Sequence, residues 1–164
     1  MTMTATIRRA TRDDGLRLIR DMRHEDRLEI QMEGHFSGPD TAVSWSLDNS
    51  TSAFALLCGD ELLCIFGTSP LFNNPSQDIM VVWALGTEAI RRHKRAFLRA
   101  TPEAIRLLYD ACPDTRLFIN AMPATYPTYR KWAERYLAAQ FSETSHVTPS
   151  GAVFTAFGIW REGA

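Results

Sequence analysis

Apolar and polar residues follow two kinds of pattern along the chain, short apolar runs typical of strands and helical spacing of apolar residues typical of amphipathic helices. Runs of β-branched and apolar residues bounded by turn residues predict strands at 6–10, 53–58, 61–66, 79–85, 116–120, 141–147 and 152–160. Apolar residues at i, i+3 and i+4 predict helices at 11–33 with a break near His24, 40–47, 101–112 and 128–139. The predicted order is β-α-α-β-β-β-α-β-α-β-β, a mixed α/β layout with hairpins at both ends.

Turn and capping residues set several of these boundaries. Gly59 and Asp60 form a two-residue connection between adjacent strand patterns, which predicts a hairpin. Thr101, Pro102 and Glu103 supply an N-cap, a proline at the first helical position and an acid in the first turn. We therefore expect a helix to begin at Thr101 and an additional short helix to occupy residues 86–100.

Composition narrows the class of protein. A chain of 164 residues with 45% apolar and 23% charged residues suits a single soluble domain spanning residues 1–164. Its net charge of −1 gives no overall attraction to nucleic acid. We expect no secretory signal and no membrane-spanning segment. Cys58, Cys64 and Cys112 lack metal-site spacing and are predicted to be reduced core thiols of a cytoplasmic-type compartment.

The stretch "WALGTEAIRRHKRAF", residues 83–97, begins as a strand and ends as a basic helix. A strand that leads into a helix N-terminus is a common place to bind a phosphate. Its five basic residues, 91–95, can contact a diphosphate, nucleic acid or an acidic partner. They can equally form a solvated helix face above Ile90 and Phe97. Both interpretations stay open.

Acidic residues gather on the first predicted helix, at Glu25, Asp26 and Glu29. A carboxylate whose pKa is tuned toward the working pH can act as a general base toward an amine. The alternative is an ordinary charged surface face. His24 and His35 have no partners at ligand spacing, so no metal site is expected.

The element order, together with "MRHEDRLEI" (22–30), "CIFGTSP" (64–70) and "WALGTEAIRRHKRAFLR" (83–99), resembles the GNAT (Gcn5-related N-acetyltransferase) superfamily over nearly the whole chain. Within it, these stretches resemble the GNAT-like proteins of tailed bacteriophages of the internal-virion-protein-A type. The resemblance implies an α/β (α+β) fold with a mixed central sheet of about six to seven strands flanked by helices.

The resemblance also implies where a cofactor would bind. A working GNAT splays two central strands around the pantetheine of acetyl-CoA and cradles its pyrophosphate in a glycine-rich loop. The corresponding cofactor-binding residues here are Leu85, Gly86, Thr87, Arg91 and Asn120. Because Gly86 is the loop's single glycine and an acid, Glu88, follows it, the sequence predicts a degenerate phosphate loop.

Catalytic residues are implied only if the protein is an enzyme. Glu25 or Glu29 would be the general base, and Tyr129 the acid that protonates the leaving thiolate. Spacing alone does not separate Tyr129 from Tyr126 and Tyr136.

Two functions follow from these observations. The sequence favours a phage-encoded protein with a degenerate acetyl-CoA site and no cofactor, acting as a virion structural or assembly component. It would bind other phage structural proteins through Arg91, Arg92 and Arg95, in the virion or the host cytoplasm, with no membrane or nucleic-acid partner and with homo-oligomerisation left open. The alternative is an active acetyl-CoA-dependent N-acetyltransferase acting on a protein or small-molecule amine.

Overall fold

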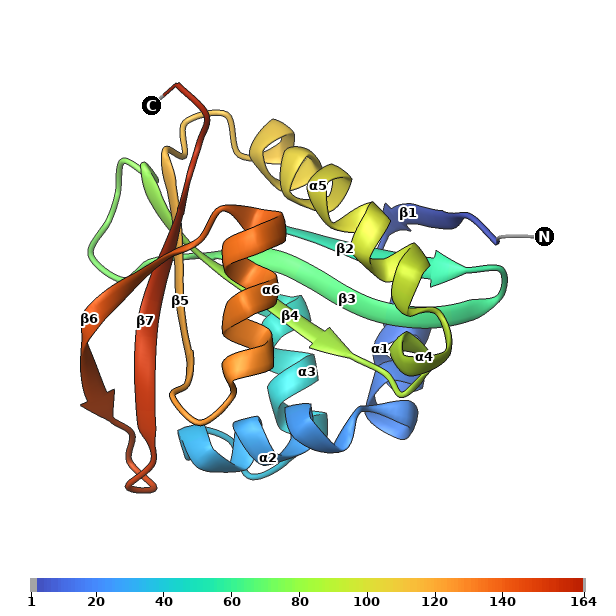
Figure 1. Cartoon of the computed structure of the whole chain (residues 1–164), viewed down its shortest axis with the longest axis horizontal. Helices are drawn as coiled ribbons and strands as arrows, with labels where there is room; N and C mark the ends of the chain where they lie inside the picture. Colours follow the sequence, from blue (N-terminus) through green and yellow to red (C-terminus); the bar gives the residue numbers. More distant parts are fainter. Residues whose placement is uncertain (1–2, 164) are drawn as a thin grey trace.

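A seven-stranded sheet with the strand order β1-β2-β3-β4-β5-β7-β6 forms the centre of the computed structural model, which describes residues 3–163 (Figure 1). All neighbouring strands are antiparallel except β4 and β5, which run parallel. The strands are β1 (Ala5–Arg9), β2 (Ser52–Cys58), β3 (Glu61–Pro70), β4 (Ile79–Gly86), β5 (Leu117–Pro123), β6 (Gln140–Val147) and β7 (Val153–Trp160). This arrangement confirms the predicted mixed sheet flanked by helices.

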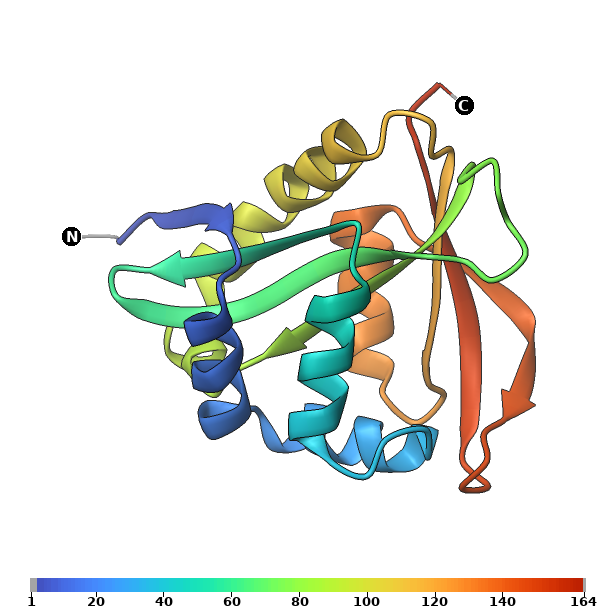
Figure 2. The same cartoon turned by 180° about the vertical axis from the view of Figure 1, so that it is seen from behind.

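Helices cover both faces of the sheet. They are α1 (Arg12–Asp21), α2 (His24–Glu33), α3 (Pro39–Asn49), α4 (Ala89–Arg92), α5 (Lys94–Ala111) and α6 (Pro127–Leu137). The long α5 and α6 lie over one face and α1 and α3 over the other, as the two opposite views show (Figures 1 and 2). The α2 helix crosses below α6, near the free end of β4 (Figure 1).

Each face has its own apolar core. Under α5 and α6, a cluster that includes Met80, Leu108 and Phe118 is almost fully buried. Under α1 and α3, a second cluster is built around Leu18 and Ile65. Side chains of β2, β3 and β4 alternate between the two clusters, as expected for strands covered on both faces.

The helix predicted to begin at Thr101 begins seven residues earlier, at Lys94, and that prediction is wrong. Thr101 does not act as an N-cap, because its hydroxyl donates to the carbonyl of Phe97 in the preceding turn at 3.1 Å. Pro102 lies inside the helix. The connection from β4 to α5 is therefore only residues 87–93 with one helical turn, and no separate segment spans 86–100.

Other predicted elements agree with the structure to within a few residues. The expected break near His24 is present, since α1 ends at Asp21 and α2 begins at His24. The three cysteines are free and buried, as predicted. None of the helices in residues 3–163 has the length and apolar character needed to cross a membrane.

The start of α1 is fixed by a buried carboxylate. Asp14 is 2% exposed and accepts hydrogen bonds from Arg8 at 2.6 and 2.9 Å and from the Thr11 amide at 2.8 Å. Burial acts to raise the pKa of Asp14, but the hydrogen bonds from Arg8 and Thr11 outweigh it and hold the pKa below its ordinary value. This carboxylate therefore joins β1 to α1 in its ionised form.

We predict that Asp14→Ala lowers the free energy of unfolding by about 1–3 kcal/mol, because it removes a cap and leaves its donors unpaired. Urea titration measures this loss. Since the folded-state pKa is depressed, the contribution of Asp14 is complete above about pH 5 and declines as the pH falls through about 4. Asp13→Ala, in the same turn but exposed, is the control. Equal losses in both variants would contradict the prediction.

Candidate active site

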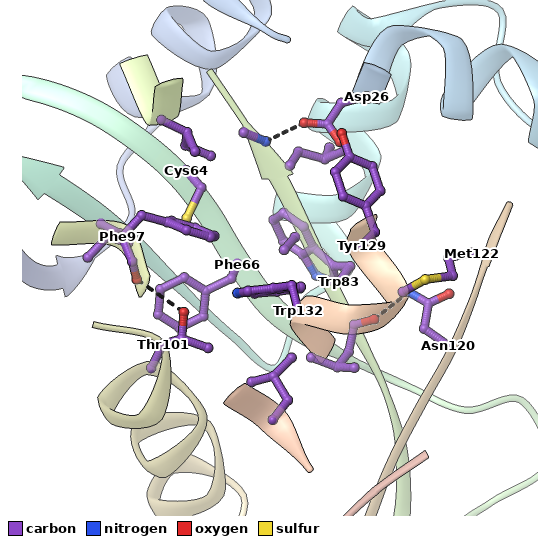
Figure 3. A pocket seen from close by; sticks show the side chains of 18 of the residues that line it. Asp26, Cys64, Phe66, Trp83, Phe97, Thr101, Asn120, Met122, Tyr129 and Trp132 are labelled. Carbon is purple, nitrogen blue, oxygen red and sulfur yellow. Dashed lines mark hydrogen bonds between the residues drawn. The ribbon is translucent and has the colours of Figure 1, made fainter. Parts of the chain in front are cut away.

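The parallel strands β4 and β5 pair over only three residues each, Ile79–Val81 with Leu117–Ile119, and then separate. The side chain of Asn120 lies at the point of separation (Figure 3). Its Oδ1 accepts the Ala121 amide at 2.7 Å, and its Nδ2 donates to the carbonyl of Val82. The side-chain amide thus takes the place of a backbone rung and holds the two strands apart.

We call the place where β4 and β5 separate the fork. Beyond it, one residue of β4 has backbone amide and carbonyl groups that no neighbouring strand pairs. Alternate residues of a strand direct their amide and carbonyl groups to the same side. Val82 meets Asn120 on the β5 side, and Gly86 donates to Asp26 at 2.8 Å and accepts from the Arg23 amide at 2.9 Å. Ala84 lies between them and directs its amide and carbonyl to the same side, where the pairing with β5 has already ended and no strand among residues 3–163 replaces it.

A cavity of about 440 Å³ occupies the gap and extends between α5, α6 and the sheet (Figure 3). This volume falls within the ~300–1,000 Å³ of small-molecule sites. Most of the lining is apolar and includes Phe66, Phe97, Leu108, Met122, Trp132 and Phe157. Cys64 also lines it, but burial raises the pKa of this thiol to about 12, so it stays neutral. The cavity suits an extended, mainly apolar ligand.

Carboxylates of α2 line one end of the cavity, where the sequence predicted a base. Asp26 is buried against Arg23, with two hydrogen bonds of 2.9 and 3.0 Å. Glu25 pairs with Arg91. Glu29 has no ion-pair partner among residues 3–163. Burial, reinforced by Asp26 and Glu33 and only partly opposed by Arg23, raises its pKa to about 8. Of the two predicted bases, Glu29 is the one whose proton affinity is tuned to neutral pH.

The structure separates the three candidate tyrosines. Only Tyr129 lines the cavity, whereas Tyr126 packs edge-on against its ring at 5.3 Å and Tyr136 is outside the lining. The Arg23 guanidinium lies 5.1 Å from the Tyr129 ring centroid. Burial and the nearby carboxylates raise the pKa of Tyr129, although Arg23 acts to lower it. Tyr129 therefore stays protonated and can donate a proton.

Predicted phosphate-binding amides at the end of β4 are already engaged. The Gly86 amide binds Asp26, the Thr87 amide donates to Leu63 O at 2.8 Å, and the Glu88 amide donates to Asp21 O at 3.0 Å. A Cβ on Gly86 would lie 2.6 Å from Ile90, so this glycine serves close packing. Leu85 lines the cavity, but Gly86 and Thr87 offer no free donor.

Free amides lie a few residues downstream, at the true start of α5. The first helical bond joins the Phe97 amide to His93 O at 3.0 Å, and no side chain caps the helix. The amides of Lys94, Arg95 and Ala96 consequently lack acceptors among residues 3–163. The two cationic side chains there are exposed and add to the positive end of the helix dipole. The sequence did not predict these free amides, because its capping pattern placed the helix start at Thr101.

The three arginines predicted to bind a partner differ in their ion pairs. Arg91 pairs with Glu25 and Glu88, and Arg92 pairs with Glu61. Arg95 has no ion pair within the described residues. No group of three potential metal ligands occurs in residues 3–163.

No family model and no curated protein matches this sequence. Solved structures do match. The acetyltransferase candidate yncA of Salmonella typhimurium, solved with acetyl-CoA, superposes with a TM-score of 0.67 at 8% identity, covering 98% of this chain and 96% of its own. A Bacillus subtilis acetyltransferase in complex with CoA superposes with a TM-score of 0.62 at 8% sequence identity, over 97% of this chain and 99% of its own. A GNAT-family protein of Chromobacterium violaceum superposes with a TM-score of 0.63 at 16% sequence identity, over 96% of this chain and 87% of its own.

This chain has the GNAT acetyltransferase fold. The fork between β4 and β5 is thus part of a GNAT sheet, and the cavity lies against it. Identities this low establish the fold and leave the function to be argued from the site itself.

Asn120→Val is predicted to lower the free energy of unfolding by about 1–3 kcal/mol, because Val82 O and the Ala121 amide lose their partner at a half-buried position. Chemical denaturation measures the loss, and faster hydrogen exchange at Ala121 locates it. Thr128→Ala removes a hydroxyl from the same cavity and leaves the fork intact, so it serves as the control. Unchanged exchange at Ala121 would show that the fork does not depend on this side chain.

Glu29→Gln is predicted to gain stability over the native protein as the pH rises. With a folded-state pKa of about 8, above the ordinary value near 4.3, native Glu29 loses stability as the pH rises from about 4.5 to 8. The glutamine variant lacks this loss, so the two unfolding free energies converge near pH 4 and diverge toward pH 9. Glu143→Gln, on an exposed strand, is the control. Parallel pH profiles for native and Glu29→Gln protein would refute the raised pKa.

Proposed function

We propose that this GNAT-fold protein binds an acyl-CoA thioester in the β4–β5 fork and transfers its acyl group to an amine. The open edge of β4 at Ala84 carries the proposal, because it faces a ligand-sized cavity that begins beside an uncapped helix N-terminus. Two of the structural neighbours hold acetyl-CoA or CoA, which supports the same class of ligand here.

The residues present fit such a cofactor at three places. The amides of Lys94–Ala96 and the two cations there can bind a pyrophosphate. The backbone of Ala84 can pair with the amides of a pantetheine arm, and the apolar cavity can enclose the arm. The loop predicted from Gly86 and Thr87 takes no part, since its amides are bound internally.

When bound, acetyl-CoA supplies a thioester whose acyl carbon forms an amide bond with the amine while the C–S bond breaks. Glu29 is placed to accept the proton that the amine loses, and its pKa of about 8 suits that role near neutral pH. Tyr129 holds a proton that can pass to the sulfur of the leaving thiolate, which becomes the free thiol. Glu25 is the weaker base, because a hydrogen bond from its own backbone amide and the ion pair with Arg91 together hold the pKa of its carboxyl below the ordinary value.

A non-catalytic binding role is the second candidate, and the internally bonded amides of Gly86, Thr87 and Glu88 favour it. The virion assembly role, with phage proteins as partners, depends on the sequence resemblance alone. Of the three arginines assigned to it, Arg95 is the one that keeps a free charge among the described residues. Homo-oligomerisation belongs with this second candidate.

The proposal predicts that isothermal titration with CoA and acetyl-CoA gives micromolar dissociation constants. The double variant Lys94→Glu, Arg95→Glu should weaken both by about tenfold or more, because it removes two phosphate contacts and places acids at the helix start. Arg12→Glu, which changes charge on the opposite face of the sheet, is the control. The absence of heat with millimolar acetyl-CoA would overturn the proposal and favour the non-catalytic role.

Turnover of acetyl-CoA with a mixture of amines, followed by thiol release, tests the catalytic part separately. Glu29→Gln and Tyr129→Phe should each lower kcat by about 10²-fold or more and leave acetyl-CoA affinity within about twofold. The native rate should rise with pH up to about 8 as Glu29 loses its proton. Full activity in Glu29→Gln would reassign the base.

A further inference from the structure

The cavity is longer than the fork requires. Its lining follows one face of α5 from Lys94 through Thr101 to Leu108, which corresponds to about 21 Å at 1.5 Å per residue. Phe118 lies in the paired part of β5, where it pairs with the lining residue Ile159 and stacks on Tyr109, the neighbour of Leu108, with ring centroids 4.2 Å apart. The cavity therefore passes from the helix start, over the open edge of β4, and on beyond the fork.

We define the inner chamber as the part of the cavity beyond Thr101. We assign to it six of the cavity's lining residues, of which Leu108 and Ile159 are buried and the others partly buried: Ala104, Ile105, Leu108, Leu137, Phe157 and Ile159. None of these side chains is charged, and the Thr101 hydroxyl at the entrance already donates to Phe97 O. A phosphate, a carboxylate or an ammonium group would be buried there without a partner, at high energetic cost.

We propose that the inner chamber receives an aliphatic acyl chain longer than acetyl, so that the acyl donor is a medium-chain acyl-CoA thioester. This inference rests on the proposed function and names its substrate class. A donor held with its phosphates at Lys94 and its pantetheine along Ala84 directs whatever continues past the fork toward this chamber. An acetyl group is too short to fill it.

Packing supports an occupant. Native interiors are close-packed, and an empty apolar volume loses the contacts that a filling group would make. The Trp132 indole N–H, buried in the cavity wall, has no acceptor among the described residues (Figure 3). A neutral chain attached to a carbonyl group supplies both the apolar contacts and an oxygen for such a donor.

The test is a chain-length series on the full chain, with CoA, acetyl-, butanoyl-, hexanoyl- and octanoyl-CoA as probes. Titration calorimetry measures affinity, and thiol release with a fixed amine measures kcat/KM. Each buried methylene adds about fourfold in affinity, so hexanoyl-CoA should bind at least tenfold more tightly than acetyl-CoA. Ala104→Phe fills the chamber from α5 and should abolish this gain while acetyl-CoA binding stays within about twofold.

Two controls keep the result interpretable. Glu103→Phe adds the same ring to the exposed side of α5 and should retain the full chain-length gain. Ile105→Trp provides a second filling variant if Ala104→Phe does not fold. A flat or falling series with measurable CoA binding overturns the chamber assignment and leaves the proposed function standing. No binding of any probe, CoA included, overturns the proposed function as well.

Discussion

The site depends on the two hydrogen bonds that the Asn120 side chain makes where the short parallel pairing of β4 and β5 ends. In an unbroken ladder, the Ala121 amide would donate directly to the carbonyl of Val82. Here the Asn120 side chain satisfies both groups, so the polar requirement of the backbone is met without bringing the strands together. Because nothing then draws β5 toward β4, Ala84 keeps an unpaired edge and the cavity has room to form between the strands.

Charge pairing determines which groups near the fork can react. Asp26 is committed to Arg23 and the Gly86 amide, and this bond ties α2 to the free end of β4. Glu25 is committed to Arg91. Glu29 is the carboxylate left in the same low-dielectric region with acids for neighbours, and its raised pKa follows from that exclusion. The ion pairs thus hold the structure together, while the unmatched acid is available for proton transfer.

Most of the fold was accessible from the sequence because hydrophobic period and turn chemistry are local. The break near His24 and the hairpin at Gly59 came from neighbouring residues alone. The start of α5 was not accessible, because the Thr101–Pro102 pattern is a genuine capping signal that burial of the helix's apolar face overrides. At the site, the sequence named the acids of α2 as candidate bases, and the structure places them along the cavity. The choice of Glu29 over Glu25 and of Tyr129 over its neighbours required contacts across 60 or more residues.

The corrected helix start changes how the degenerate phosphate loop is to be understood. A loop can lose its glycines without the protein losing its anion site, because the first amides of any uncapped helix remain donors. In this chain the three amides at the end of β4 donate to Asp26, Leu63 and Asp21. These bonds connect the end of β4 to α2, β3 and α1. The free amides lie after the single turn of α4, at the start of α5, where Lys94 lines the cavity. The absence of a glycine-rich motif is therefore weak grounds for inactivity when the geometry it serves is supplied by a neighbouring turn.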